Sequence, residues 1–209
     1  MTAGAAPATS ATDRSDFRHI LVSGTKIGVA VGAGVIAYLL ISRFVPAGAI
    51  RALLQALLVL GVGVVTSFLP AQWTGARSTQ GIAGAAAVGL WGTIVFMAID
   101  IILLRPLKAY PWTWDAVGGG STWWYLPIWW MLGTFVAWMG GVITAGRATR
   151  GGNDATSLRS LALPVLAGAV AITAALQVAR LGIYLPVAAG AGFTVTLTVL
   201  AVVAIARKA

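Results

Sequence analysis

The sequence predicts an all-α fold, a polytopic transmembrane bundle of six helices with both termini in the cytoplasm. Of its 209 residues, 59% are hydrophobic and 9% are charged, and the mean hydropathy is +0.91. Soluble domains carry roughly 25% charged residues, and one soluble core of this length has too little interior to hide so much apolar surface. The apolar residues also fall into runs of roughly 20, the length that crosses a hydrocarbon core.

The elements follow from charges, prolines and glycine-rich breaks. Residues 1–19 are rich in Ala, Thr and Ser without an apolar period, which predicts a polar N-terminal tail. Residues 20–209 are expected to form a single transmembrane domain. The run between Leu161 and Ile205 is too long for one crossing, so we expect a helical hairpin that turns at Arg180. The six predicted spans are 25–44, 51–71, 81–104, 125–145, 161–180 and 185–206.

The distribution of Lys and Arg predicts the orientation. With the N-terminus in the cytoplasm, nine cations fall on the cytoplasmic side and five on the opposite side, which agrees with the positive-inside rule. The net charge of +9 is spread over helix ends without forming a basic patch, so no nucleic-acid partner is expected. The nine are Arg14, Arg18, Lys26, Arg77, Arg147, Arg150, Arg159, Arg207 and Lys208, and the five are Arg43, Arg51, Arg105, Lys108 and Arg180.

The residue types that the chain lacks exclude most catalytic chemistry. There is no Cys, all five acids are Asp, and the one His is His19. Structural zinc, iron–sulfur clusters and thiol redox chemistry need Cys or clustered His, and no nucleophile-elbow or phosphate-loop motif is present. We therefore expect no enzyme activity, no metal site and no cofactor held by Cys or His. His19 is interpreted as an interfacial side chain, with a metal site shared with another subunit as the alternative.

Aromatic residues crowd the connection between the third and fourth spans. We name residues 105–125 the Trp-rich loop and expect it on the non-cytoplasmic side. Trp and Tyr favour the membrane interface, so anchoring is the first interpretation. A docking surface for a neighbouring subunit and a wall for a lipid, quinone or pigment are the alternatives. The six candidate contact residues are Trp112, Trp114, Trp123, Trp124, Trp129 and Trp130.

Asp100 is the one acid inside a predicted span, and Arg105 follows it by five residues. An ionisable group in a membrane helix is a functional candidate by default. Because Asp100 lies only about 7 Å from the predicted helix end, at about 1.5 Å per residue, it is also expected to reach the surface or pair with Arg105. A structural role and a role in proton relay or substrate binding both remain open.

Small residues recur at four-residue spacing in the first span, where Gly24, Gly28 and Gly32 form two overlapping GxxxG steps. Such a ridge lets two helix backbones approach closely, which favours packing in lipid. The spacing leaves open whether the partner is another helix of this chain or another protein.

These observations lead to three functional hypotheses. The first is a non-catalytic accessory subunit that scaffolds a larger, energy-transducing complex of the bacterial inner membrane, contacting other integral subunits and lipids through the glycine ridge and the Trp-rich loop. The second is a small proton-linked transporter or channel that uses Asp100. The third is a carrier or enzyme that acts on a lipid, quinone or pigment at the Trp-rich loop. The preference for Arg over Lys, eleven to three, beside abundant Ala and Gly, is typical of a GC-rich bacterial genome.

Overall fold

The computed structural model describes residues 16–104, 106–107, 125–151 and 156–207. This part of the chain is helical and contains no strand. Six of its helices are long and apolar enough to cross a membrane. They are α1 (Phe17–Phe44), α2 (Ala49–Trp73), α3 (Thr79–Ile99), α5 (Tyr125–Gly151), α6 (Leu158–Val178) and α7 (Leu185–Ala206), and α3 continues into a π-helical segment, η1 (Asp100–Leu104).

Each predicted span overlaps one of these helices, and the differences lie at the ends. The predicted tail extends to residue 19, whereas α1 begins at Phe17. The reason is the Asp16 carboxylate, which accepts a hydrogen bond from the His19 backbone N–H and so caps the helix. Residues 1–15 of the tail lie outside the described residues.

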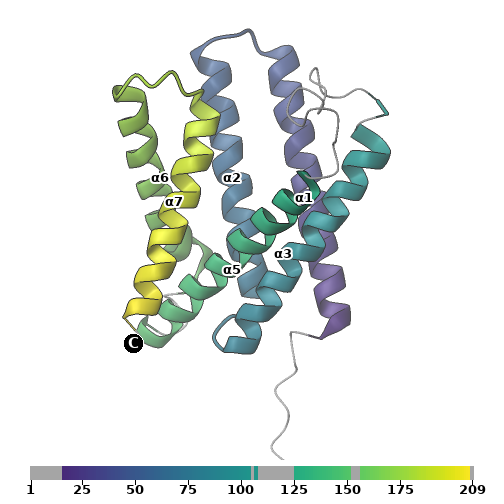
Figure 1. Ribbon diagram of the computed structural model, residues 1–209, viewed down its shortest axis with the longest axis vertical. Helices are drawn as coiled ribbons and strands as arrows, with labels where there is room; N and C mark the ends of the chain where they lie inside the picture. Colours follow the sequence, from purple (N-terminus) through teal and green to yellow (C-terminus); the bar gives the residue numbers. More distant parts are fainter. Residues whose placement is uncertain (1–15, 105, 108–124, 152–155, 208–209) are drawn as a thin grey trace, which may run out of the picture.

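The helices form a bundle in which α5 runs obliquely across the others (Figure 1). Helix α3 packs between α1 and α5, α6 packs against α7, and α2 contacts both groups. Helix α1 begins and α7 ends at the same end of the molecule, which we call the terminal end (Figure 1). The opposite end, where α1 finishes and α7 begins, is called the distal end.

The connection between α6 and α7 lies at the distal end and turns where the sequence predicts. Arg180 and Gly182 adopt positive φ angles of 51° and 68°. The Gln177 side chain donates to the Ile183 carbonyl at 3.0 Å, across the turn. The long apolar run is therefore divided into two helices by a short left-handed turn.

The hydrophobic core occupies the terminal half of the bundle. Phe68 lies near the end of α2, Leu161 near the start of α6 and Ala201 near the end of α7, and all three are fully buried. The complete cluster comprises Phe68, Val136, Met139, Ile143, Leu161, Val165, Ala169, Phe193, Leu197 and Ala201. The distal half is packed differently, because it contains a cavity.

Candidate functional site: an apolar cavity between the helices

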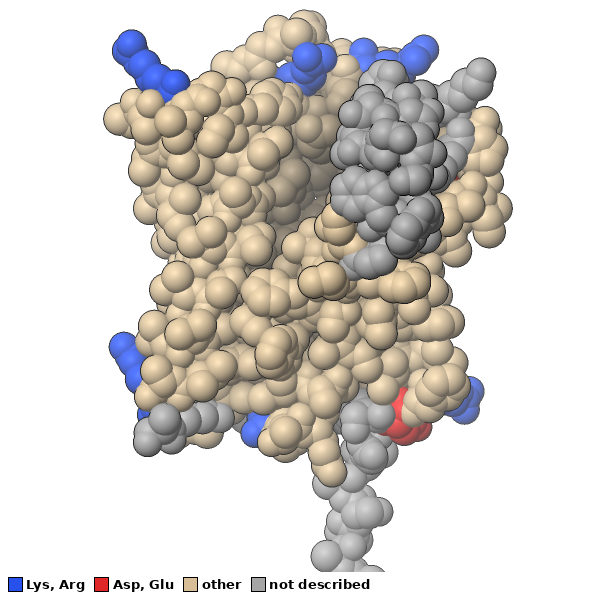
Figure 2. Space-filling view, in the orientation of Figure 1, with Lys and Arg blue, Asp and Glu red and all other residues tan. Residues whose placement is uncertain are grey.

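A cavity of about 470 Å³ lies among α1, α2, α3, α5 and α7. Val136 and Phe193 belong both to its wall and to the hydrophobic core, so the core closes the cavity toward the terminal end. Figure 2 shows the molecule hollowed in the distal half, beside α7. Helix α5 runs obliquely toward the terminal end (Figure 1), and its first half contributes Trp129, Leu132 and Val136 to the cavity wall.

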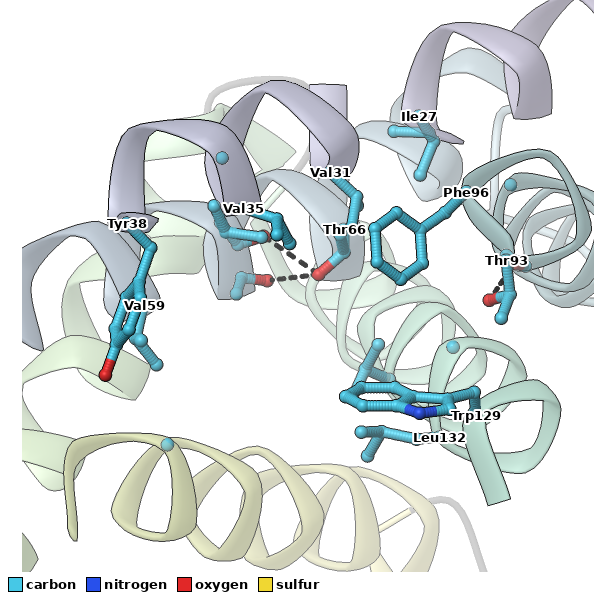
Figure 3. A pocket seen from close by; sticks show the side chains of 18 of the residues that line it. Ile27, Val31, Val35, Tyr38, Val59, Thr66, Thr93, Phe96, Trp129 and Leu132 are labelled. Carbon is cyan, nitrogen blue, oxygen red and sulfur yellow. Dashed lines mark hydrogen bonds between the residues drawn. The ribbon is translucent and has the colours of Figure 1, made fainter. Parts of the chain in front are cut away.

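Aliphatic and aromatic side chains form most of the cavity wall. In Figure 3, Val31 and Val35 of α1 face Leu132 and the Trp129 ring of α5 across the cavity. Phe96 of α3 points between them. Its ring and that of Trp129 meet edge to face, with centroids 6.5 Å apart. Such a wall suits an apolar molecule with a flat or extended shape.

Three threonines in the wall donate their hydroxyl hydrogen bonds to backbone carbonyls of their own helices. Thr66 donates to the Val62 carbonyl at 2.9 Å, Thr93 to a carbonyl one turn earlier at 3.0 Å, and Thr194 likewise at 2.9 Å. A hydroxyl that donates in this way still carries lone pairs. These side chains therefore offer the cavity hydrogen-bond acceptors.

Asp100 lines the cavity and is only 4% exposed. The sequence-based expectation was a side chain that reaches the surface near the helix end or pairs with Arg105, whereas here the side chain faces the interior of the bundle. Helix α3 continues as η1 at this residue and ends at Leu104, as the predicted span does, and the Asp100 N–H is shared between the Phe96 and Met97 carbonyls. π-Helical turns occur frequently at functional sites. Arg105, the expected ion-pair partner, lies outside the described residues.

Of the six tryptophans predicted as contact residues, the two at the start of α5 have different surroundings. Trp129 lines the cavity and is 37% exposed. Trp130, the next residue, is 40% exposed and is not part of the cavity wall. Trp112, Trp114, Trp123 and Trp124 lie outside the described residues, as does most of the Trp-rich loop.

A polar network at the distal end joins three helices that surround the cavity. The Gln55 amide is 2% exposed and donates to the Ser42 hydroxyl at 2.7 Å, while the Tyr184 hydroxyl donates to the Gln55 carbonyl oxygen. Arg51 donates to the Ser42 carbonyl at 3.1 Å. Tyr38 lines the cavity one helical turn before Ser42. Sequence reasoning missed this network, although Gln55 is a lone amide near the start of an apolar span.

The glycine ridge of α1 packs inside this chain, against α3. A Cβ atom on Gly24 would lie 2.7 Å from Trp91, and one on Gly28 would lie 2.6 Å from the Gly92 carbonyl oxygen. Gly32 is also buried, facing Ile99. The partner that the spacing left open is thus α3, and the ridge is covered by the chain itself.

His19 makes local contacts at the terminal end. Its Nε2 atom lies 3.1 Å from the Trp73 carbonyl oxygen and 3.3 Å from the Ser23 hydroxyl. Lys26 lies over the Trp73 ring, 5.9 Å from its centroid. These contacts tie the start of α1 to the end of α2. In the described part of the chain, no three His, Cys, Asp or Glu residues group as metal ligands would.

Fold and site together define a class: an α-helical bundle with six helices apolar enough to cross a membrane, which encloses an apolar cavity with one carboxyl group in its described wall. No protein-family model, curated protein or solved structure matches the chain.

Proposed function

We propose that this chain is a non-catalytic, multi-pass protein of the bacterial cytoplasmic membrane that binds one apolar molecule, of the lipid, quinone or pigment class, in the cavity of its distal half. The observation that carries the proposal is the cavity itself. Small-molecule sites are concave, mostly apolar and roughly 300–1,000 Å³ in volume, with a few polar groups that set orientation. A volume of about 470 Å³ and one carboxyl group among the described residues of the wall fit this description.

The distribution of charge supports the membrane location. On the face shown in Figure 2, Lys and Arg gather at the two ends, and the band between them shows no described Lys or Arg side chain. The side chains of Leu57, Val170 and Val202, on helices α2, α6 and α7, are more than half exposed. Apolar side chains on the outside of a bundle are expected to face lipid. The positive-inside rule then assigns the terminal end, with both termini, to the cytoplasm.

The arrangement supports a binding chamber better than a through path. The hydrophobic core, which includes Phe68 and Ala201, fills the terminal half of the bundle. Among the described helices the cavity therefore lies in the distal half and does not continue to the terminal end. A proton-linked transporter that uses Asp100 would require a second conformation in which this core opens. We therefore favour ligand binding over transport.

The scaffolding hypothesis loses one of its two proposed contact surfaces. The glycine ridge of α1 is covered by α3 and is not exposed to another subunit. The Trp-rich loop, the second surface, lies largely outside the described residues. Scaffolding of a larger complex stays a prediction, but no feature of the described residues favours it over ligand binding.

Photolabelling tests the proposal. The probe is a twelve-carbon alcohol with a diazirine near its tail, added to the protein in lipid nanodiscs, and the labelled peptides are mapped by mass spectrometry. We expect saturable labelling of the cavity-lining parts of α1, α3 and α5 that excess unlabelled dodecanol removes. Labelling that only tracks exposure to lipid would contradict the proposal.

A matched pair of variants locates the site. Gly190 lines the cavity, and a Cβ atom there meets only Val59, at an ordinary 3.5 Å. Gly190→Phe should fill the cavity and lower saturable labelling severalfold. Gly61→Phe is the control, because Gly61 is exposed on α2 and its Cβ would meet nothing within 4 Å. Equal labelling of both variants would refute the assignment of the site.

A further inference from the structure

We infer that the molecule bound in the cavity carries a protonated amine, and that Asp100, Thr93 and the Phe96–Trp129 pair receive it. This inference rests on the proposed function and names the chemical class of its ligand. It is carried by three kinds of group that line the cavity: a carboxyl group, a hydroxyl acceptor and two aromatic rings.

Three of these groups lie on one face of α3 and its continuation η1. Thr93, Phe96 and Asp100 are separated by three and four residues, the spacings that align side chains along an α-helix, and all three line the cavity. Figure 3 shows Thr93 and Phe96 beside each other, with the Trp129 ring opposite. Asp100 lies one turn beyond Phe96, where η1 begins. A head group held near Phe96 is thus within one helical turn of both oxygen-bearing side chains.

The charged residues of the wall favour a ligand of positive charge. Of the described residues that line the cavity, none is Lys or Arg, and Asp100 is the one acid. A carboxylate surrounded by apolar groups favours a cationic partner, and the low dielectric strengthens that attraction. Asp100 already has an interaction within the protein. A ligand ammonium would therefore join or replace this contact. An anionic head group would instead be repelled.

The aromatic pair provides a second, independent reason. An ammonium group within about 6 Å of a Trp or Phe ring face is attracted by the ring quadrupole, most strongly where water is excluded. Trp129 and Phe96 both line the cavity and meet edge to face, so the ring that contributes its edge keeps both of its faces clear of the other ring. The valines and leucines of α1 and α2 then accommodate the apolar body. A long-chain or polycyclic amine satisfies all of these contacts.

The test compares three photoprobes with the same twelve-carbon diazirine chain and different head groups: an amine, an alcohol and a carboxylic acid. All three are titrated at neutral pH against the full-length protein in zwitterionic nanodiscs. Because hydrogen bonds to charged groups contribute more than neutral ones, we expect half-maximal cavity labelling by the amine at a concentration at least about tenfold lower than by the alcohol. We expect the acid to label most weakly.

Asp100→Asn should remove the preference for the amine while the alcohol still labels the cavity, which also shows that the variant is folded. Asp16→Asn is the matched control, because it removes a carboxylate at the terminal end and keeps a side chain that caps α1. It should leave the preference intact. Equal labelling by amine and alcohol, or an amine preference that survives Asp100→Asn, would overturn this inference and leave the proposed function standing. Absence of saturable cavity labelling by every probe would overturn both.

Discussion

A close backbone contact between α5 and α2 leads to a sharp stability prediction. Gly140 of α5 packs against the backbone of α2, and a Cβ atom on it would lie 1.9 Å from the Ser67 carbonyl oxygen and 2.6 Å from its carbonyl carbon. A carbon atom and a carbonyl oxygen approach to roughly 3.3 Å. Gly140→Ala therefore requires α2 and α5 to separate by roughly 1.4 Å, the difference between roughly 3.3 Å and the 1.9 Å at which the added Cβ atom would otherwise lie from the Ser67 oxygen.

The neighbouring glycine is the control. Gly141 is also buried on α5, but a Cβ atom there would lie 3.5 Å from Ala85 and Ile82, an ordinary contact. Both changes are Gly to Ala in the same helix, so their helix propensities change equally. Overpacking of this kind costs typically about 1–3 kcal/mol. Because the propensity change is common to both variants, we expect Gly140→Ala to have a free energy of unfolding about 1–3 kcal/mol lower than that of Gly141→Ala.

Unfolding by steric trapping in bicelles measures both free energies while the chain stays in a bilayer. Identical stabilities for the two alanine variants would refute the close approach of α2 and α5 at Ser67.

Two further predictions concern the distal network and the orientation. Tyr184→Phe removes the donor to the buried Gln55 oxygen, so we expect a loss of about 1–2 kcal/mol and faster amide hydrogen exchange at the start of α7; unchanged exchange there would contradict the network. The chain has no Cys, so single cysteines report topology without background. Ala47→Cys at the distal end should react with a membrane-impermeant thiol reagent in intact cells, and Gln80→Cys at the terminal end only after lysis; the reverse pattern would invert the proposed orientation.

The sequence predicts the helices well because hydropathy over about 20 residues reports directly on membrane-spanning length. It predicts their ends less well, because caps such as Asp16 depend on single hydrogen bonds. The hairpin at Arg180 was predictable from length alone. The glycine ridge of α1 was visible in the sequence, but its partner α3 was not, since the spacing of small residues does not identify the helix that they contact.

The candidate site was less predictable, for a physical reason. Asp100 stands out because a charge in an apolar span is rare, yet the sequence does not show whether its side chain faces lipid or the cavity, which is set by the packing of α3 against α1 and α5. Trp129 and Trp130 look alike in the sequence, and only the direction of α5 distinguishes the one that lines the cavity. Gln55 and Tyr184 are 129 residues apart, so no local pattern joins them. Tertiary geometry, rather than composition, forms the cavity.

Native mass spectrometry of the protein, extracted from its own membrane in a mild detergent, tests the central claim most directly. The account predicts a one-to-one adduct of an apolar molecule on the unmodified protein, kept by Gly61→Phe and lost by Gly190→Phe. A protein that carries no adduct, or an adduct that Gly190→Phe retains in full, would contradict the claim that this cavity is a ligand site.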